Sequence, residues 1–403
     1  MNHKRVLAVL LLMGMCFSVQ LLKGNGSAEA ASALQLLLDD YDQMWDVLYE
    51  SYPFLSCTGK DAEQLEALRL EKRALIGKKA ADPAGLYHIL QDTCSALGNI
   101  AHLRAVSPEE YSAFYADRSE DRENGIIHKD TDIWLDPKTV EVYAQLGFRE
   151  ARPANSSGLY SVGMDYFPDL HAAYFRFPTF YSEELTRQAV PIAAFLEKHP
   201  DVEHLIFDIT GNRGGYTSAW INGIVSAFPD PVEWQSTSYI RITETVARTY
   251  EGIPVEPIDF EAADLPDWVE SLGMTHQGTH RLSLPLEAYA GEKVERSVKR
   301  WLVIDGEVAS AAEMFARFCK DTGWAAVAGT AAKGDGLVSA YAPSVVRLNN
   351  TGLLFMFFAE SGVNEDGSLN VLRGTEPDYF AKPTESPLEA CIRWIAISDG
   401  REP

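Results

Sequence analysis

The sequence has few basic residues for its length, few cysteines and no apolar run of comfortable membrane-spanning length. It carries 35 Lys and Arg against 58 Asp and Glu in 403 residues, which gives a formal net charge of −23. Nucleic-acid binding depends on clustered Lys and Arg, so this excess of acid argues against a nucleic-acid partner. The five cysteines include no Cys-x-x-Cys pair, which excludes a zinc knuckle.

Residues 1–30 have the pattern of a secretory signal peptide. Lys4 and Arg5 form a basic start, Val6 to Val19 is almost unbroken apolar sequence, and Ala28-Glu29-Ala30 is a small-x-small cleavage signal. The apolar part is shorter than the roughly 20 residues of a membrane span, so we expect cleavage rather than a retained anchor. The protein is then exported, either extracellular or associated with the cell envelope, without stable membrane insertion.

Four cysteines remain after such cleavage, Cys57, Cys94, Cys319 and Cys391. In an exported protein some of them can pair, and Cys57 with Cys94 is the favoured pair because both fall in the amino-terminal helical part. The alternative is buried free thiols, and Cys319 lies on the apolar face of its expected helix.

The remaining chain predicts an α/β protein with an amino-terminal helical subdomain over residues 31–105. Apolar residues at three- and four-residue spacing from Leu34 to Leu48 predict a first helix, which Pro53 ends. Further helices are expected at about 61–76 and 83–97. Residues 106–400 then form the core, in which residues 106–170 are expected to hold short strands and connections, and residues 229–295 a loop-rich insertion.

A strand-helix-strand pattern begins near residue 172. Ala173–Phe177 and His204–Asp208 read as strands, with an amphipathic helix over Ser182–His199 between them. This order and spacing predict a parallel βαβ unit. Later strands are expected at 301–304, 325–328 and 353–358, and a terminal helix at 386–397.

A glycine-rich turn follows the second of these strands directly. Its sequence from Asp208 to Gly215 is Asp-Ile-Thr-Gly-Asn-Arg-Gly-Gly, with three glycines in five residues. Glycines at the carboxyl end of a parallel strand allow positive φ and let a ligand approach the backbone. The turn lacks the Gly-Lys-Ser/Thr of a phosphate loop and is no dinucleotide fingerprint, so we expect no cofactor. It indicates an oxyanion site, with a plain strand-to-helix turn as the alternative.

A serine stands at the start of a later helix, after the strand that ends at Ile304. The stretch Ser310-Ala311-Ala312-Glu313 fits a capping box, in which the serine hydroxyl only caps the helix. It also fits a nucleophile held at a strand-to-helix turn, where backbone N–H groups can stabilise an oxyanion. A third element, Leu97-Gly98-Asn99-Ile100-Ala101-His102, places a histidine after a glycine-containing turn, in either a structural or a catalytic role.

Together these elements resemble the serine peptidase family of the carboxyl-terminal processing (tail-specific) proteases, in its tricorn-like and retinoid-binding-protein-like branch without a PDZ domain. The family pattern Asp-x-Arg-Gly-Asn-x-Gly-Gly is matched by Asp208 to Gly215, with Thr210 in the arginine position. The nucleophile turn is matched by Ser310 to Glu313, the Leu-x-Asp-Gly-His element by Leu97 to His102, and the Gly-x-x-Pro-Asp element by Gly374 to Asp378. The resemblance implies a ClpP/crotonase-like layered ββα core.

The resemblance also implies roles for individual residues. Ser310 is then the nucleophile, and the oxyanion donors are the backbone N–H groups of Ala311 and of Gly214 or Gly215. The processing proteases use a lysine as base, but Asp335 stands at that position in Lys333-Gly334-Asp335-Gly336.

The tricorn-like branch uses a histidine as base, so His102 is the expected base, which an imidazole with a pKa near neutrality suits. Asp335 and Glu376 are the candidates for orienting it. Lys333 is a fallback base, since in an extended segment it would point to the same side as Asp335.

The expected function is an exported serine peptidase that acts on polypeptides or oligopeptides through an acyl-enzyme. The alternative is a catalytically inactive member that binds peptides or apolar ligands in the same cleft. A coenzyme A-dependent acyl enzyme is disfavoured in an exported acidic chain. His276 and His280 are spaced like metal ligands on a helix, but Gly278 lies between them and the glutamate of that motif is missing, so no metal site is expected. Self-association stays open.

Overall fold

The structure is a computed structural model that describes residues 31–148, 162–261, 265–284, 294, 297–339 and 342–401. The signal peptide expected over residues 1–30 lies outside these described residues. Within them, no helix combines the length and the apolar character needed to cross a membrane.

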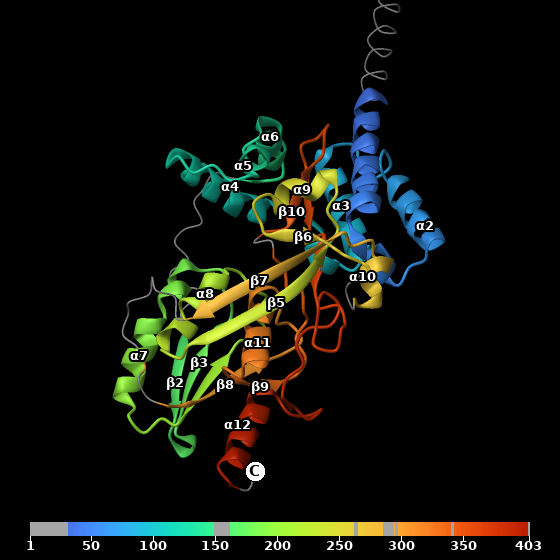
Figure 1. The fold of residues 1–403 in the computed structure, drawn as a ribbon. Helices are drawn as coiled ribbons and strands as arrows, with labels where there is room; N and C mark the ends of the chain where they lie inside the picture. The colour runs from blue at the N-terminus through green and yellow to red at the C-terminus, as the bar shows by residue number, and fades with distance from the viewer. Residues whose placement is uncertain are drawn as a thin grey trace, which may run out of the picture.

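The amino-terminal part is helical, as the sequence predicts, and occupies the upper right of Figure 1. Its elements are a helix over residues 31–51, η1 (Pro53–Thr58), α2 (Ala62–Arg73), α3 (Pro83–Ala96) and η2 (Ile100–His102). Asp61 and Gln64 form a capping box at the start of α2, and Pro83 occupies the first turn of α3. Local capping therefore fixes where these helices begin.

Three further helices follow, where the sequence was expected to give short strands. They are α4 (Pro108–Glu123), α5 (Thr131–Trp134) and α6 (Pro137–Gln145). The expectation was wrong because α4 is largely polar and buries only Tyr111, so its hydrophobic periodicity is faint. Tyr111 stacks on Tyr143 of α6, with ring centroids 4.0 Å apart, and this contact anchors the helices to each other.

The central sheet has six strands in the order β13-β9-β8-β4-β3-β2. Their bounds are β2 (Gly163–Phe167), β3 (Ala172–Arg176), β4 (His204–Asp208), β8 (Lys299–Ile304), β9 (Ala326–Gly329) and β13 (Tyr379–Phe380). The strands from β3 to β13 pair in parallel and β2 is antiparallel to β3. This confirms the predicted α/β class and the parallel βαβ unit of β3 and β4.

Helices cover both faces of this sheet, as Figure 1 shows. On one face, buried side chains of the strands pack with α7 (Ala189–Lys198), α8 (Thr217–Ile221) and α11 (Ala311–Thr322), and with the 3-10 turns η4 (Glu183–Arg187) and η5 (Val225–Ala227). On the other face, alternate side chains pack with α12 (Pro387–Ser398), near η3 (Pro168–Leu170). Burial on both faces explains the apolar sequence of β4 and β8.

Two smaller sheets connect this core to the helical part. One has the order β1-β11-β10 and the other β12-β5-β7-β6. Their bounds are β1 (Arg104–Ala105), β10 (Ser344–Arg347), β11 (Leu354–Phe357), β5 (Val232–Ile240), β6 (Val255–Pro257), β7 (His276–Leu284) and β12 (Glu360–Gly362). One hydrophobic cluster joins buried residues of 37–148, 239–274 and 346–371, so the core of the helical part continues beyond residue 105.

The loop-rich insertion expected over residues 229–295 is instead built on a long antiparallel ribbon. Strands β5 and β7 pair over nine residues each, and α9 (Glu244–Tyr250), β6 and α10 (Asp267–Ser271) lie between them in sequence. In Figure 1 the ribbon runs from the sheet to the helical part. The prediction failed because both strands mix polar and apolar residues, which weakens the period-two signal. Residues 285–293 lie outside the described part.

The favoured pairing of Cys57 with Cys94 is wrong, since all four cysteines of the described chain are free thiols. Cys94, Cys319 and Cys391 are buried, and burial raises the pKa of the Cys94 thiol to about 12. Such thiols remain protonated at neutral pH and act as small apolar side chains.

A buried histidine joins α12 to the sheet. His204 of β4 is fully buried, its Nδ1 accepts a hydrogen bond of 3.1 Å from Trp301 Nε1, and its Nε2 lies 3.1 Å from Asp399 Oδ2. Because an indole N–H can only donate, this arrangement requires a neutral imidazole. Burial lowers the pKa of His204 below 6.5, although Asp399 opposes the shift.

Acid should therefore destabilise the protein through His204. Between the lowered folded pKa and 6.5, the unfolded chain binds a proton that the folded protein excludes, so the free energy of unfolding falls as pH drops below about 6.5. We expect the urea midpoint to fall more between about pH 7.5 and pH 5.5 in the wild type than in His204→Gln, which keeps a donor and an acceptor but does not titrate. An equal fall in both proteins would contradict this role.

Candidate active site

Ser310 stands at the turn between β8 and α11 in an uncommon backbone conformation. Its φ is 55° and its ψ is −128°, and its side chain makes no capping hydrogen bond. The Glu313 carboxylate does not reach back to the Ser310 amide, which donates to the Gly334 carbonyl at 3.2 Å instead. The capping box is therefore absent. A non-glycine residue at such a φ costs about 1–3 kcal/mol, which surrounding structure must compensate.

The glycine turn packs directly against Ser310. A Cβ on Gly214, whose φ is +97°, would lie 2.7 Å from the Ser310 Cβ. A Cβ on Gly215, whose φ is +133°, would lie 2.3 Å from the carbonyl carbon of Phe180. Both positions therefore require glycine for their φ and for the close approach of neighbouring chain.

The three expected oxyanion donors differ in their availability. The Gly214 N–H donates to Asn212 Oδ1 at 2.9 Å, so Gly214 is already engaged and does not serve as the donor in this conformation. Among the described residues, the N–H groups of Gly215 and Ala311 donate to no other group. Two backbone donors that line one pocket with Ser310 are the elements of an oxyanion hole.

His102 is held by a turn whose conformation is unusual for its residues. Asn99, Ala101 and His102 all have positive φ, between 51° and 59°. Tyr52 donates its hydroxyl to the Ile100 carbonyl at 2.8 Å, and the Phe358 amide donates to the Ala101 carbonyl at 2.8 Å. These bonds fix the turn against the helical part and against the residue that follows β11.

The structure brings His102 and Asp335 together. His102 Nδ1 lies 2.5 Å from Asp335 Oδ2, an ion-pair contact whose angles depart from those of a hydrogen bond. The His102 ring packs edge-on to the Phe358 ring, with centroids 5.1 Å apart. A carboxylate at one ring nitrogen orients an imidazole and leaves the other nitrogen for proton transfer.

Asp335 belongs to a segment that touches the nucleophile turn on both sides. Gly334 accepts the Ser310 N–H, and a Cβ on Gly336 would lie 2.4 Å from the Ser310 carbonyl oxygen. Asp335 itself has a φ of 66°. His102, Asp335 and Ser310 thus converge through shared neighbours, although no hydrogen bond joins Ser310 Oγ to His102 in the described structure.

Lys333 and Glu376 lie apart from this arrangement. Lys333 was expected to point with Asp335 only in an extended segment, and the segment bends at Gly334, which has a φ of +102°. The Lys333 side chain is exposed. Glu376 forms an exposed ion pair with Arg373, so it does not orient His102.

A pocket of about 220 Å³ opens beside Ser310. Its wall includes Gly215, Ala311, Phe358, Ser339 and His280. From the sequence, His280 is a candidate only for a metal ligand, because no sequence pattern predicts that β7 lies near Ser310. His280 Nε2 is buried without a partner in the described structure, and burial lowers the pKa of this histidine below 6.5. The pocket therefore presents a neutral imidazole and hydroxyl groups.

The departure from the family pattern at Thr210 has a structural counterpart. Arg176 Nη1 on β3 donates to Asp208 Oδ1 at 2.7 Å and also to Thr210 Oγ1. A guanidinium from the neighbouring strand thus lies at the start of the glycine turn, where the pattern has an arginine within the turn itself. No sequence pattern predicts this contact, because Arg176 is distant in the chain from Asp208 and Thr210.

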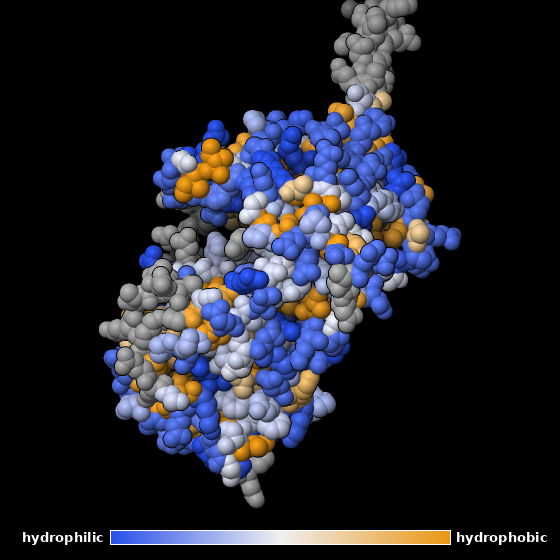
Figure 2. All heavy atoms as spheres, in the orientation of Figure 1, coloured by the Kyte–Doolittle hydropathy of each residue, from blue (hydrophilic) through white to orange (hydrophobic). Residues whose placement is uncertain are grey.

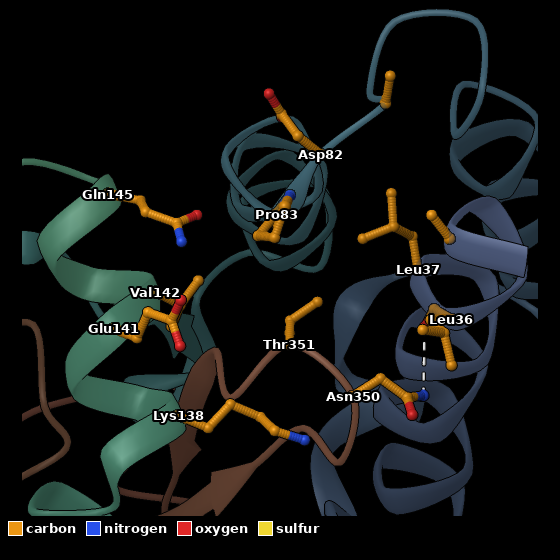
Figure 3. A pocket seen from close by; sticks show the side chains of 12 residues that line it. Leu36, Leu37, Asp82, Pro83, Lys138, Glu141, Val142, Gln145, Asn350 and Thr351 are labelled. Atoms are coloured by element: carbon orange, nitrogen blue, oxygen red, sulfur yellow. Dashed lines mark hydrogen bonds between the residues drawn. The ribbon is translucent and has the colours of Figure 1, made fainter. Parts of the chain in front are cut away.

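A second hollow, of about 320 Å³, lies between the helix over residues 31–51, α3, α6 and the turn at 350–351 (Figure 3). Its walls combine Leu37, Pro83 and Val142 with polar groups at the rim, including Lys138 and Glu141. The face of the molecule drawn in Figure 2 is mostly hydrophilic, with scattered apolar patches. In the part of the chain that the structure describes, no three His, Cys, Asp or Glu side chains are grouped to hold a metal.

Sequence comparison places this site within a known family. The profile of peptidase family S41 matches residues 171–380, which hold the glycine turn, Ser310 and Asp335 and make up more than half of the chain. The chain belongs to peptidase family S41. S41 is a family of serine-type peptidases, to which the carboxyl-terminal processing proteases also belong. No curated protein sequence matches the chain.

Solved structures resemble this S41 chain over most of its length. A candidate peptidase from Parabacteroides merdae ATCC 43184 is 16% identical with a TM-score of 0.54, and the match covers 89% of this chain and 96% of that one. Mature CPAF complexed with lactacystin is 14% identical with a TM-score of 0.49, covering 91% and 97%. The photosystem II D1 C-terminal processing protease is 15% identical with a TM-score of 0.42, covering 87% and 93%. At these identities the Parabacteroides likeness supports the fold alone.

Proposed function

We propose that this S41 member is an active serine peptidase that hydrolyses polypeptides or oligopeptides, with Ser310 as nucleophile, His102 as base and Asp335 as the acid that orients His102. The observation that carries the proposal is the His102–Asp335 contact of 2.5 Å, made by a residue whose two neighbours touch the Ser310 backbone. An inactive relative has no need to keep an imidazole, a carboxylate and a strained serine together.

In the proposed reaction, Ser310 Oγ attacks the carbonyl carbon of a peptide bond while His102 Nε2 takes the hydroxyl proton. The N–H groups of Gly215 and Ala311 stabilise the negative oxygen of the tetrahedral intermediate. The C–N bond then breaks as His102 returns the proton to the leaving amine, which leaves an acyl group on Ser310. Water, deprotonated by His102, attacks this ester, and its cleavage restores the serine and releases the carboxylic acid.

The His102–Ser310 hydrogen bond forms, in this proposal, when substrate occupies the pocket. Catalytic hydrogen bonds are often long or misaligned in unliganded enzymes and tighten in the substrate complex. The turn and the ring of His102 are both held in place, by backbone contacts and by Asp335 and Phe358 respectively. The adjustment is therefore expected in the Ser310 side chain, which makes no capping hydrogen bond. Export of the protein, indicated by residues 1–30, belongs to the same proposal.

The competing function is a peptide-binding protein without catalysis. Two observations support this alternative: Asp335 stands at the lysine position of the processing proteases, and Lys333 is exposed. The two functions share the pocket beside Ser310 and differ in the reactivity of the Ser310 hydroxyl. A covalent probe therefore separates them better than a binding assay.

The test is reaction of the purified mature chain with a tagged fluorophosphonate, followed by mass spectrometric mapping of the adduct. The peptidase proposal expects one adduct, on Ser310, formed by displacement of fluoride from phosphorus by the activated Oγ. Urea-unfolded protein is the control and should stay unlabelled, since the base and the oxyanion donors then disperse. Absence of an adduct on the folded protein, or adducts spread over many serines, would favour the binding protein.

A further inference from the structure

A buried asparagine lies behind the Asp335 segment and contacts three consecutive residues of it. Asn370 is 1% exposed, and its side-chain Oδ1 accepts hydrogen bonds from the Gly336 N–H at 3.1 Å and the Leu337 N–H at 3.3 Å. Its backbone carbonyl accepts the Asp335 N–H at 3.2 Å. One residue thus fixes the peptide groups on both sides of the Asp335 side chain.

The approach of Asn370 to this segment is close enough to dictate its sequence. A Cβ on Gly334 would lie 2.0 Å from the Asn370 carbonyl oxygen, so only glycine fits there. Asp335, in turn, has a φ of 66°, which is uncommon for a residue other than glycine, although aspartate tolerates it better than most. The bonds to Asn370 stabilise this conformation.

Asn370 is itself anchored to the nucleophile helix. Its Nδ2 donates to Glu313 Oε1 at 2.7 Å and to Asn364 Oδ1 at 3.2 Å. Glu313 is fully buried in the first turn of α11, three residues after Ser310, and its Oε1 also accepts from the Thr375 amide and hydroxyl. Burial raises the pKa of Glu313 to about 7, and the hydrogen bonds from Asn370 and Thr375 offset part of the cost of burying this side chain. The side-chain path therefore runs from the Ser310 helix through Glu313 and Asn370 to the Asp335 segment.

We propose that Asn370 is a positioning residue of the active site, which Glu313 anchors and which sets the distance between Asp335 and the Ser310 turn. The inference rests on the proposed function, because Asn370 acts only through Asp335 and His102.

A double-mutant cycle tests the inference through the rate of labelling by the tagged fluorophosphonate. Asp335→Asn should slow labelling on the order of 10⁴-fold, because a neutral amide holds the wrong histidine tautomer. Asn370→Ala should slow labelling on the order of 10²-fold, as expected of a small displacement of a catalytic group. In the Asp335→Asn background, however, Asn370→Ala should cause little further loss, since its effect passes through Asp335.

A charged variant gives a second, independent reading. Asn370→Asp removes the Nδ2 donor and places a carboxylate against Glu313, so labelling should slow. Asn364→Ala is the matched control, because it removes a bond to Asn370 but none to the segment 335–337, and it should label near the wild-type rate despite a similar loss of stability.

The outcomes distinguish failure of this inference from failure of the proposed function. If Asp335→Asn labels normally, the orienting acid is misassigned and the proposed function itself is at fault. If Asp335→Asn is slow but Asn370→Ala is additive with it, or if Asn370→Asp labels at the wild-type rate, Asn370 is a structural residue only and the inference is overturned.

Discussion

Replacing Ser310 with alanine is expected to abolish fluorophosphonate labelling and to lower the turnover of an unfolded protein substrate such as casein by about 10⁶-fold. The loss is large because the nucleophile, its base and the acid act as a unit, and the remaining binding groups cannot form an acyl-enzyme. The measurements are the labelling yield and the initial rate of release of fluorescent casein fragments.

Stability supplies the control for this variant. Ser310 adopts a strained conformation and its hydroxyl makes no hydrogen bond within the described residues, so Ser310→Ala should unfold at the wild-type urea concentration or slightly above it. A well-folded variant that still cleaves casein would show that another residue is the nucleophile or that a contaminant supplies the activity.

The second large effect is expected from His102→Ala. Without an imidazole the Ser310 proton has no acceptor, and the loss of turnover should again be on the order of 10⁶-fold. Lys333→Ala is the matched variant, because Lys333 is the alternative base but is exposed and precedes the bend at Gly334. It should retain wild-type labelling and turnover.

The two variants together give a direct reading of the base. With a histidine base, turnover is lost in His102→Ala and kept in Lys333→Ala. Retained activity in His102→Ala together with its loss in Lys333→Ala would assign the base to Lys333.

Much of the fold could be predicted because its elements have strong local signals. Strand β4 is buried throughout, has an apolar centre and ends at the glycine turn, and α11 has apolar residues on one face. By contrast, α4 buries a single residue, and β5 and β7 mix polar and apolar positions, so neither pattern identified its element. These elements form because of partners that are distant in sequence, and periodicity does not report such partners.

The candidate site also contains some residues that the sequence identifies and others that it does not. Ser310, Gly215 and His102 follow recognisable turns, so the residues themselves could be proposed from sequence. The choice of Asp335 over Glu376 could not be made, because it depends on how the chain bends at Gly334. Asn370 and His280 reach the site from elements with no motif, and only the tertiary arrangement identifies them.

The pairing of β1 with β11 has a consequence for when activity can arise. His102 precedes β1, and its turn is held by Tyr52 of the helical part and by Phe358 just after β11, whereas Ser310 belongs to the central sheet. During synthesis His102 is therefore made long before Ser310, and the two residues cannot come together until residue 358 has folded. If the protein crosses a membrane unfolded, as the proposed signal peptide implies, His102 and Ser310 stay apart inside the cell that synthesises the chain.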